Sequence, residues 1–154
     1  MIQRRDLLIA VGAGVLSTPL ASFGQQSAKV TRIGFLGPAF ASDTASEVAA
    51  LRTGLRELGY VEGKDIVFEF RWAEGNYDRL LALATELVRV GADIIVTHGT
   101  PAPRAVKQAT TTIPVVMAHS GDPVSAGIVT SLARPGGNIT GSAVFVPDLM
   151  AKRL

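Results

Sequence analysis

Short runs of β-branched and aromatic residues alternate with longer amphipathic segments from residue 30 onward. The short runs predict five strands, at residues 30–36, 65–71, 92–97, 113–118 and 139–142. The runs at 92–97 and 113–118 are almost wholly apolar, which is typical of neighbouring central strands buried on both faces of a parallel sheet. The run at 65–71 has two unequal faces, which favours a place near the sheet edge.

Apolar residues at helical spacing predict two long helices after the first and second strands. The first spans residues 44–58, where Thr44 and Glu47 suit a capping box and Gly59 suits the C-cap. The second spans residues 76–90 and begins with an asparagine, which is a favoured N-cap residue. Each helix has one apolar stripe and is therefore expected to pack on the sheet.

Two residue pairs that end in proline predict the starts of two further helices. Thr100 and Asp122 serve as N-caps, and a proline follows each at the first helical position. The helices are expected to cover residues 101–109 and about 123–132, and a turn follows at 134–138. This alternation of strands and helices predicts an α/β domain with an open parallel sheet of about five strands and helices on both faces.

Residues 1–24 have the pattern of an export signal peptide. Arg4 and Arg5 precede an apolar run at residues 7–16, and a small-x-small site ends at Gly24, near which cleavage is expected. The apolar run is too short for a membrane span, which needs about 20 residues. The paired arginines favour the twin-arginine export route, although an ordinary secretory leader can also begin with two arginines.

Cysteine is absent, which excludes a disulfide framework and a lipid-anchor cysteine. The mature protein is therefore expected to be free in the periplasm. The whole chain has a formal net charge of +2, and removal of the leader takes two of the 15 basic and one of the 13 acidic residues. Because neither a basic cluster nor an interleaved aromatic stripe is visible, the sequence does not favour nucleic-acid binding.

The expected strand ends predict where a small ligand would bind. Parallel strands end at one edge of an open sheet, so the loops at 37–44, 97–101 and 119–123 are expected to line one crevice. Helix N-termini there would favour an anion such as an amino-acid carboxylate. The candidate ligand-binding residues are Gly37, Ser42, Thr44, Thr97, His98, Gly99, Thr100, His119, Ser120 and Asp122. The same residue types also suit plain strand-to-helix turns, and N-capping alone would explain Asp122.

Aromatic residues near the second strand allow two interpretations. Trp72 and Tyr77 flank the end of that strand and could stack on a ligand ring, whereas a lone tryptophan at a strand end is more typical of packing. Phe35, Phe68 and Phe70 are expected in the core.

Catalysis has little support in the sequence. It has no cysteine nucleophile, no Gly-x-Ser-x-Gly elbow, no phosphate loop and no dinucleotide fingerprint, so no enzyme and no cofactor are expected. His98 and His119 at the ends of the central strands, with Asp43 or Asp122, could form a divalent-metal site, but their spacing matches no recognised zinc pattern. A His-dependent metal hydrolase therefore remains only as an alternative.

Three stretches of the chain resemble a known family: residues 55–78 (LRELGYVEGKDIVFEFRWAEGNYD), 121–124 (GDPV) and 132–141 (LARPGGNITG). They are similar to substrate-binding proteins of bacterial ABC importers, in the branch with tryptophan- and tyrosine-binding members. The resemblance implies a type I periplasmic binding fold, in which a ligand lies between two similar α/β lobes, each with a sheet in the flavodoxin-like order 2-1-3-4-5.

The resemblance also implies a domain organisation. Residues 25–146 would be the N-terminal lobe of a two-lobed periplasmic binding protein, and residues 147–154 would begin a second lobe. The chain therefore looks truncated, and weak ligand binding or none is expected, since tight sites bury about 70–90% of a ligand.

The resulting functional prediction is a periplasmic solute-binding component of an ABC transporter. It would capture a small amino acid-like or aromatic carboxylate ligand and deliver it to a permease in the inner membrane. A homodimer through the exposed crevice or the sheet edge is a further option. The alternative from another class is a non-catalytic receiver or interaction domain.

Overall fold

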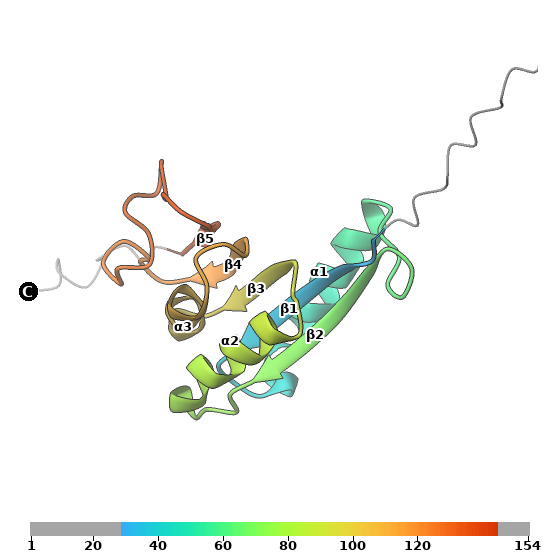
Figure 1. Ribbon diagram of the computed structural model, residues 1–154, viewed down its shortest axis with the longest axis horizontal. Coiled ribbons are helices and arrows are strands. Elements are labelled where there is room, and N and C mark those ends of the chain that lie inside the picture. The colour runs from blue at the N-terminus through green and yellow to red at the C-terminus, as the bar shows by residue number, and fades with distance from the viewer. Residues whose placement is uncertain (1–28, 145–154) are drawn as a thin grey trace, which may run out of the picture.

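The computed structural model describes residues 29–144, which contain one parallel sheet of five strands in the order β2-β1-β3-β4-β5 (Figure 1). This order and the α/β class confirm the prediction. The strands are β1 (Thr31–Gly37), β2 (Ile66–Trp72), β3 (Ile94–His98), β4 (Val115–Ser120) and β5 (Ile139–Ala143). The predicted leader at 1–24 and the predicted start of a second lobe at 147–154 lie outside the described residues.

Helices cover the two faces of the sheet unequally (Figure 1). Beneath α1, the cluster of buried side chains draws on β1, β2 and β3, whereas α2 and α3 share a larger cluster on the other face. The helical segments are η1 (Ala41–Thr44), α1 (Ala45–Glu57), η2 (Tyr77–Arg79), α2 (Leu80–Arg89) and α3 (Pro101–Ala109). Between residues 29 and 144 no helix is long and apolar enough to cross a membrane.

The core forms because consecutive residues of β1 and β3 point to opposite faces. Phe35 packs in the cluster under α1, and the next residue, Leu36, is fully buried on the side of α2 and α3. On β3, Val96 and Ile95 divide in the same way. Each fully buried side chain of this size contributes about 1.5–3 kcal/mol. The two strands between both helical layers therefore anchor the sheet.

Strand β4 is buried on one face only, so the prediction of burial on both faces is wrong. Val115 and Met117 belong to the core under α3, but Val116 between them is 37% exposed. The cluster under α1 reaches Val96 on β3 and contains no residue of β4. The physical reason is topological: α1 connects β1 to the edge strand β2, so it lies over that half of the sheet.

The helix predicted at residues 123–132 is also wrong, because the segment forms a turn instead. The Asp122 carboxylate accepts hydrogen bonds from the N–H groups of Val124 and Ser125, at 2.9 and 3.1 Å. Gly127 then adopts a φ of +67°, which ends the turn. The next residues, Ile128 and Val129, are buried in the core, so their packing outweighs the continuation of a helix.

Helix ends differ from the predictions in their capping. Thr44 and Thr100 occupy the N-cap positions of α1 and α3, but neither side chain caps its helix, so the predicted capping box of Thr44 is wrong. Asn76 caps η2, where its side chain accepts from the N–H of Asp78 at 3.2 Å. Gly59 follows α1 with a φ of +91°, as the predicted C-cap requires.

Replacement of Gly141 by alanine tests the close approach of β5 to β4. Gly141 has a φ of +142°, and an added Cβ would overlap the Met117 carbonyl and lie 2.6 Å from the Met117 nitrogen. Overpacking and backbone strain should together lower the free energy of unfolding by at least about 2 kcal/mol in a urea titration.

The matched control is Gly137→Ala. Gly137 has a φ of +84°, and an added Cβ would meet no atom within 4 Å, so this change carries backbone strain without a clash. Equal losses of stability in the two variants would contradict the proposed contact between β5 and β4.

Candidate functional site

Three loops meet at the carboxyl edge of the sheet, as the sequence predicts. The Gly99 N–H donates to the His119 carbonyl at 2.8 Å, and the Gly121 N–H donates to the Thr100 hydroxyl at 3.1 Å. A Cβ on Gly99 would lie 3.3 Å from Pro38 Cγ, which brings the first loop against the second. We call residues 37–44, 97–101 and 119–122 the rim.

Gly37 and Gly99 are required by packing and backbone geometry. A Cβ on Gly37 would overlap the Trp72 ring, so the glycine makes room for that indole. Gly99 has a φ of +72°, which few residues other than glycine adopt. Both glycines therefore have a structural reason to be where they are, independent of any ligand.

Two histidines lie side by side on adjacent strands of the rim. His98 of β3 pairs in register with His119 of β4, after an irregularity in the ladder, and their ring centroids are 5.5 Å apart at an interplanar angle of 18°. His98 is half-buried and His119 is exposed. Imidazole nitrogens can donate or accept hydrogen bonds, so the pair brings adaptable polar groups to the rim.

Glu47, in the first turn of α1, belongs to the same region. A hydrogen bond from the Ser46 hydroxyl and one from the backbone N–H of Glu47 hold the pKa of this carboxyl below its ordinary value, and His98 and His119 act in the same direction. Side chains alternate along β3, so His98 points to the same face as Val96, which packs under α1, and the His119 ring lies beside it. In the sequence, Glu47 is assigned only to a capping box with Thr44. Its position three residues after Thr44 is the one sequence signal that could have placed it near the rim.

Two buried hydroxyl groups at the rim have no hydrogen-bond partner among the described residues. Thr44 is 2% exposed and Ser120 is 0% exposed, and the Oγ1 of Thr44 and the Oγ of Ser120 both lack a partner. Leaving a buried hydroxyl unpaired costs about 1–3 kcal/mol. Such groups are rare in folded proteins, and a functional role is one of the recognised reasons for them.

Other polar side chains of the rim already have hydrogen-bond partners in the protein. Asp122 caps the turn that follows it, and hydrogen bonds from the backbone of Ser125 and then Val124 lower the pKa of its carboxyl. The Ser42 hydroxyl contacts Asp43 at 3.2 Å, and the Thr97 hydroxyl faces the Val116 carbonyl at 3.5 Å. These side chains have structural explanations, whereas Thr44 and Ser120 do not.

The helix N-termini at the rim are less suited to an anion than the sequence suggested. Pro101 and Pro103 in the first turn of α3 have no N–H group, and Ala102 between them is fully buried. At the start of α1, the Glu47 carboxylate already accepts from its own backbone N–H. Neither terminus therefore offers a full set of free donors to a ligand carboxylate.

Trp72 packs at the edge of the core, which agrees with the sequence-based interpretation that a tryptophan at a strand end packs against its neighbours. Its ring centroid lies 5.1 Å from that of Phe35 and 6.0 Å from that of Phe70, to which it is nearly parallel. Phe70 and Phe68 are partly buried against the cluster under α1. The aromatic residues of β2 therefore stabilise the sheet edge.

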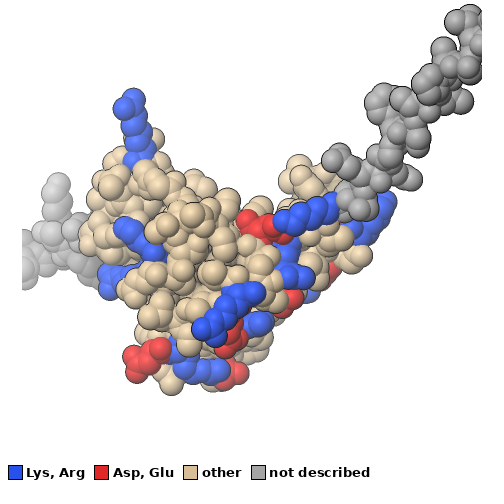
Figure 2. Space-filling model, in the orientation of Figure 1, with Lys and Arg blue, Asp and Glu red and all other residues tan. Residues whose placement is uncertain are grey.

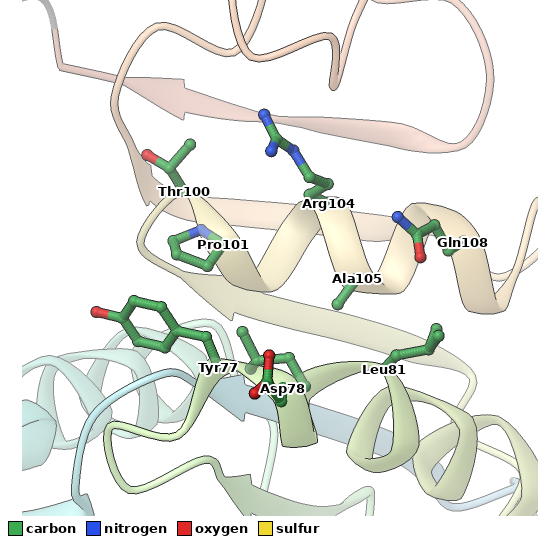
Figure 3. A pocket seen from close by; sticks show the side chains of 9 residues that line it. Tyr77, Asp78, Leu81, Thr100, Pro101, Arg104, Ala105 and Gln108 are labelled. Atoms are coloured by element: carbon green, nitrogen blue, oxygen red, sulfur yellow. The ribbon is translucent and has the colours of Figure 1, made fainter.

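Tyr77 is 59% exposed and stands at one end of a groove between α2 and α3 (Figure 3). The groove has a volume of about 390 Å³, and Thr100 and Pro101 connect it to the rim. Its lining residues are Tyr77, Asp78, Leu80, Leu81, Thr100, Pro101, Arg104, Ala105 and Gln108. It lies on the α3 side of the sheet, opposite the Glu47 side.

Three basic side chains have partners outside the rim. Figure 2 shows acidic and basic side chains side by side over β2 and α2, where Arg71 pairs with Glu86 at 2.8 Å. Arg104 and Lys107 of α3 donate to carbonyl groups of the turn after β4, at 3.1 and 2.8 Å. No lysine or arginine occurs in the rim sequence itself.

The histidines do not join acidic residues in a metal site. Across residues 29–144, no three His, Cys, Asp or Glu side chains are grouped so that they could hold a metal ion. Asp122 is held by its own turn, and Asp43 accepts from the Phe40 N–H at 3.3 Å. Among residues 29–144 the two histidines therefore have no acidic side chains grouped with them.

Comparison with known proteins gives consistent matches. Residues 41–150 match the family of ABC transporter substrate binding proteins. A tyrosine-binding protein of Clostridioides difficile (strain R20291) is 35% identical over 92 residues, which are 60% of this chain and 27% of that protein.

Solved structures are similar in fold and sequence. A domain in complex with L-Trp from Streptococcus pneumonia has a TM-score of 0.69 and 32% identity, over 74% of this chain and 38% of that chain. A conserved domain protein from Vibrio cholerae O1 has a TM-score of 0.73 and 32% identity, over 77% and 40% of the two chains. This chain thus spans less than half the length of these relatives. Since the family match covers well over half of its residues, the protein belongs to the ABC transporter substrate-binding protein family.

Proposed function

We propose that this substrate-binding protein captures an aromatic amino acid at the rim and delivers it to an ABC permease. The observation that carries the proposal is two buried hydroxyls, on Thr44 and Ser120, that have no partner within residues 29–144 and lie where three loops meet. The relatives support the ligand class, because one is named a tyrosine-binding protein and another was solved with L-Trp.

The sheet order determines how the two hydroxyls relate to each other. β3 lies between β1 and β4, so the loop that leads from β1 to Thr44 and the end of β4 at Ser120 leave the sheet on either side of the end of β3. His98 ends β3 between them. A ligand bound over β3 would therefore meet polar groups from three segments, each of which can donate or accept a hydrogen bond.

Access to the two hydroxyls requires movement of the rim. Both oxygen atoms are covered by neighbouring protein atoms. The segments around them are loops and strand ends, which move more readily than the centres of strands. A ligand that reaches these oxygens would exchange an unpaired buried group for a hydrogen bond, and this exchange favours the bound state.

The proposed ligand would be enclosed by two lobes, of which the described residues form one. One open rim covers only one side of a small molecule, whereas tight sites bury about 70–90% of the ligand surface. The affinity of this 154-residue chain should therefore be weak. Export through residues 1–24, a periplasmic location and an inner-membrane permease as partner belong to the same proposal, as does the absence of catalysis.

Ligand-induced thermal stabilisation tests this function. A ligand that binds only the folded protein raises the free energy of unfolding by about 1.4 kcal/mol at ten times its Kd. L-Tryptophan or L-tyrosine at millimolar concentration should raise Tm by a few degrees in a saturable way, and L-alanine at the same concentration should not. If no amino acid raises Tm, the proposal fails.

Removal of the unpaired hydroxyls should separate binding from stability. Thr44→Val and Ser120→Ala each remove a hydroxyl that lacks a partner, so the free energy of unfolding should stay equal or rise. The affinity for the aromatic amino acid should fall about fivefold to tenfold, which corresponds to one lost hydrogen bond of about 1–1.4 kcal/mol. Urea unfolding and equilibrium dialysis measure the two quantities.

Thr110→Val is the matched control at the opposite edge of the sheet. The Thr110 hydroxyl is buried but accepts from the N–H groups of Thr112 and Ile113, at 3.3 and 3.2 Å. The control should therefore lose stability and keep its affinity. Loss of stability without loss of affinity in Thr44→Val and Ser120→Ala would make both hydroxyls structural.

A further inference from the structure

Strand β2 is the outermost strand on one side of the sheet, and its outer edge pairs with no other strand among residues 29–144 (Figure 1). Just after the strand, the Ala73 N–H donates to the Gly37 carbonyl of β1 at 2.9 Å. Consecutive residues of a strand direct their backbone groups to alternate sides. The N–H and C=O groups of Phe68, Phe70 and Trp72 therefore point away from the sheet.

Two outward carbonyl groups of β2 accept hydrogen bonds from other parts of the chain. The Ile66 carbonyl accepts from the Gly63 N–H at 2.8 Å, so the loop before β2 already occupies the amino end of this edge. The Phe70 carbonyl accepts from the Arg71 guanidinium at 2.8 Å. A side chain can leave such a bond more easily than a loop backbone can. The part of the edge that can pair with another strand is therefore Phe68–Trp72.

The side chains of this segment divide between the two faces of the sheet. Phe68, Phe70 and Trp72 are partly buried on the α1 side. Glu69 and Arg71 lie on the opposite side, where Arg71 reaches α2 and the two side chains are 28% and 27% exposed. The edge thus has an aromatic stripe on one face and two opposite charges, two residues apart, on the other.

This arrangement is complementary to a second copy of itself in one register. When two β2 strands run antiparallel with Phe70 opposite Phe70, Phe68 of each copy faces Trp72 of the other, and Glu69 faces Arg71. The three facing pairs that involve residues 68, 70 and 72 can exchange two backbone hydrogen bonds each. A slide of two residues would set Glu69 opposite Glu69 or Arg71 opposite Arg71, and like charges directly opposite are destabilising.

We propose that the β2 edge is a homodimer surface, on which two copies of this chain pair antiparallel and form one continuous sheet. The Phe70 carbonyl would exchange the Arg71 guanidinium for the Phe70 N–H of the second copy, and the guanidinium would turn toward Glu69 of that copy. Because the paired strands run antiparallel, the two rims open at opposite ends of the dimer. Both rims stay accessible, so the inference does not depend on the proposed ligand.

Charged side chains on an edge strand often serve to prevent pairing between copies. That device depends on repulsion, whereas β2 has one charge of each sign at the spacing that attracts a second copy. On the other face, two hollows of about 250 and 350 Å³ lie between β2 and α1, beside Phe68 and beside Phe70 and Trp72. Aromatic side chains of a second copy could occupy them, and aromatic cross-strand pairs stabilise a sheet. Because the ladder is short, the dimer should be weak and reversible.

Charge reversal tests the pairing by sedimentation velocity over a range of protein concentrations. Glu69→Lys and Arg71→Glu should each weaken self-association at least about tenfold, because each change sets like charges opposite one another in two places. An equimolar mixture of the two variants should dimerise as the parent protein does. In the mixed dimer, the introduced lysine faces the introduced glutamate, and the remaining Arg71 faces the remaining Glu69.

The matched control is Arg134→Glu, which makes the same charge change at an exposed position in the turn before β5, on the other side of the sheet, and should leave self-association unchanged. Urea unfolding checks that each variant folds, since Glu69 also lies 3.9 Å from the Arg32 Nε and Arg71 pairs with Glu86. A parent protein that stays monomeric overturns the inference. So does a mixture of folded variants that stays monomeric, or a dimer that persists in each single variant.

A single introduced cysteine tests the register, because the chain has no other cysteine. Phe70→Cys should form a disulfide between copies under mild oxidation, since a facing hydrogen-bonded pair has its Cα atoms about 5.5 Å apart, within disulfide reach. Phe68→Cys is the control, because the two copies of this residue would lie about 14 Å apart along the strands. Cross-linking at Phe68 as efficient as at Phe70, or at neither position, would make the proposed pairing wrong even if the charge variants fail to fold.

Discussion

Parallel pairing of β1, β3 and β4 is the constraint on which the site depends. Parallel strands end at the same edge, so the pairing brings together three loops that lie far apart in the sequence. The pairing is held by side chains that fill both faces of β1 and β3, such as Phe35 and Leu36 on opposite sides. A substitution that weakens this core would therefore move the three loops apart, although every residue of the rim would be unchanged.

The two edges of the sheet differ in how their polar groups are satisfied. At the amino edge, the Thr110 hydroxyl accepts two backbone N–H groups, and the Asn138 amide donates to the Ile113 carbonyl at 2.7 Å. At the carboxyl edge, the buried hydroxyls of Thr44 and Ser120 have no partner in the part of the chain that the structure describes. The amino edge also holds one buried nitrogen without a hydrogen-bond partner among residues 29–144, the Nε of Arg32, so the contrast between the two edges applies to the hydroxyl groups.

Charge is distributed with the same asymmetry. On β2, on α2 and in the segment between them, oppositely charged side chains pair at the surface, and such exposed pairs contribute about 0–1 kcal/mol each. These pairs mainly keep the outer surface solvated. Glu47 differs because its exposed carboxylate accepts hydrogen bonds only from the Ser46 hydroxyl and its own backbone N–H.

The sequence by itself determined the order of the five strands along the chain, the helices that follow β1, β2 and β3, the positions of the loops at the rim and, through the resemblance, the family, but not the absence of a helix at residues 123–132. It did so because apolar periodicity reports local burial. Only the tertiary structure decided that α1 covers β3 and leaves Val116 of β4 exposed. It also decided that the Thr100 hydroxyl serves Gly121 instead of capping α3, and that Thr44 stays unpaired. These outcomes depend on which distant segment competes for each group, and no local pattern records that competition.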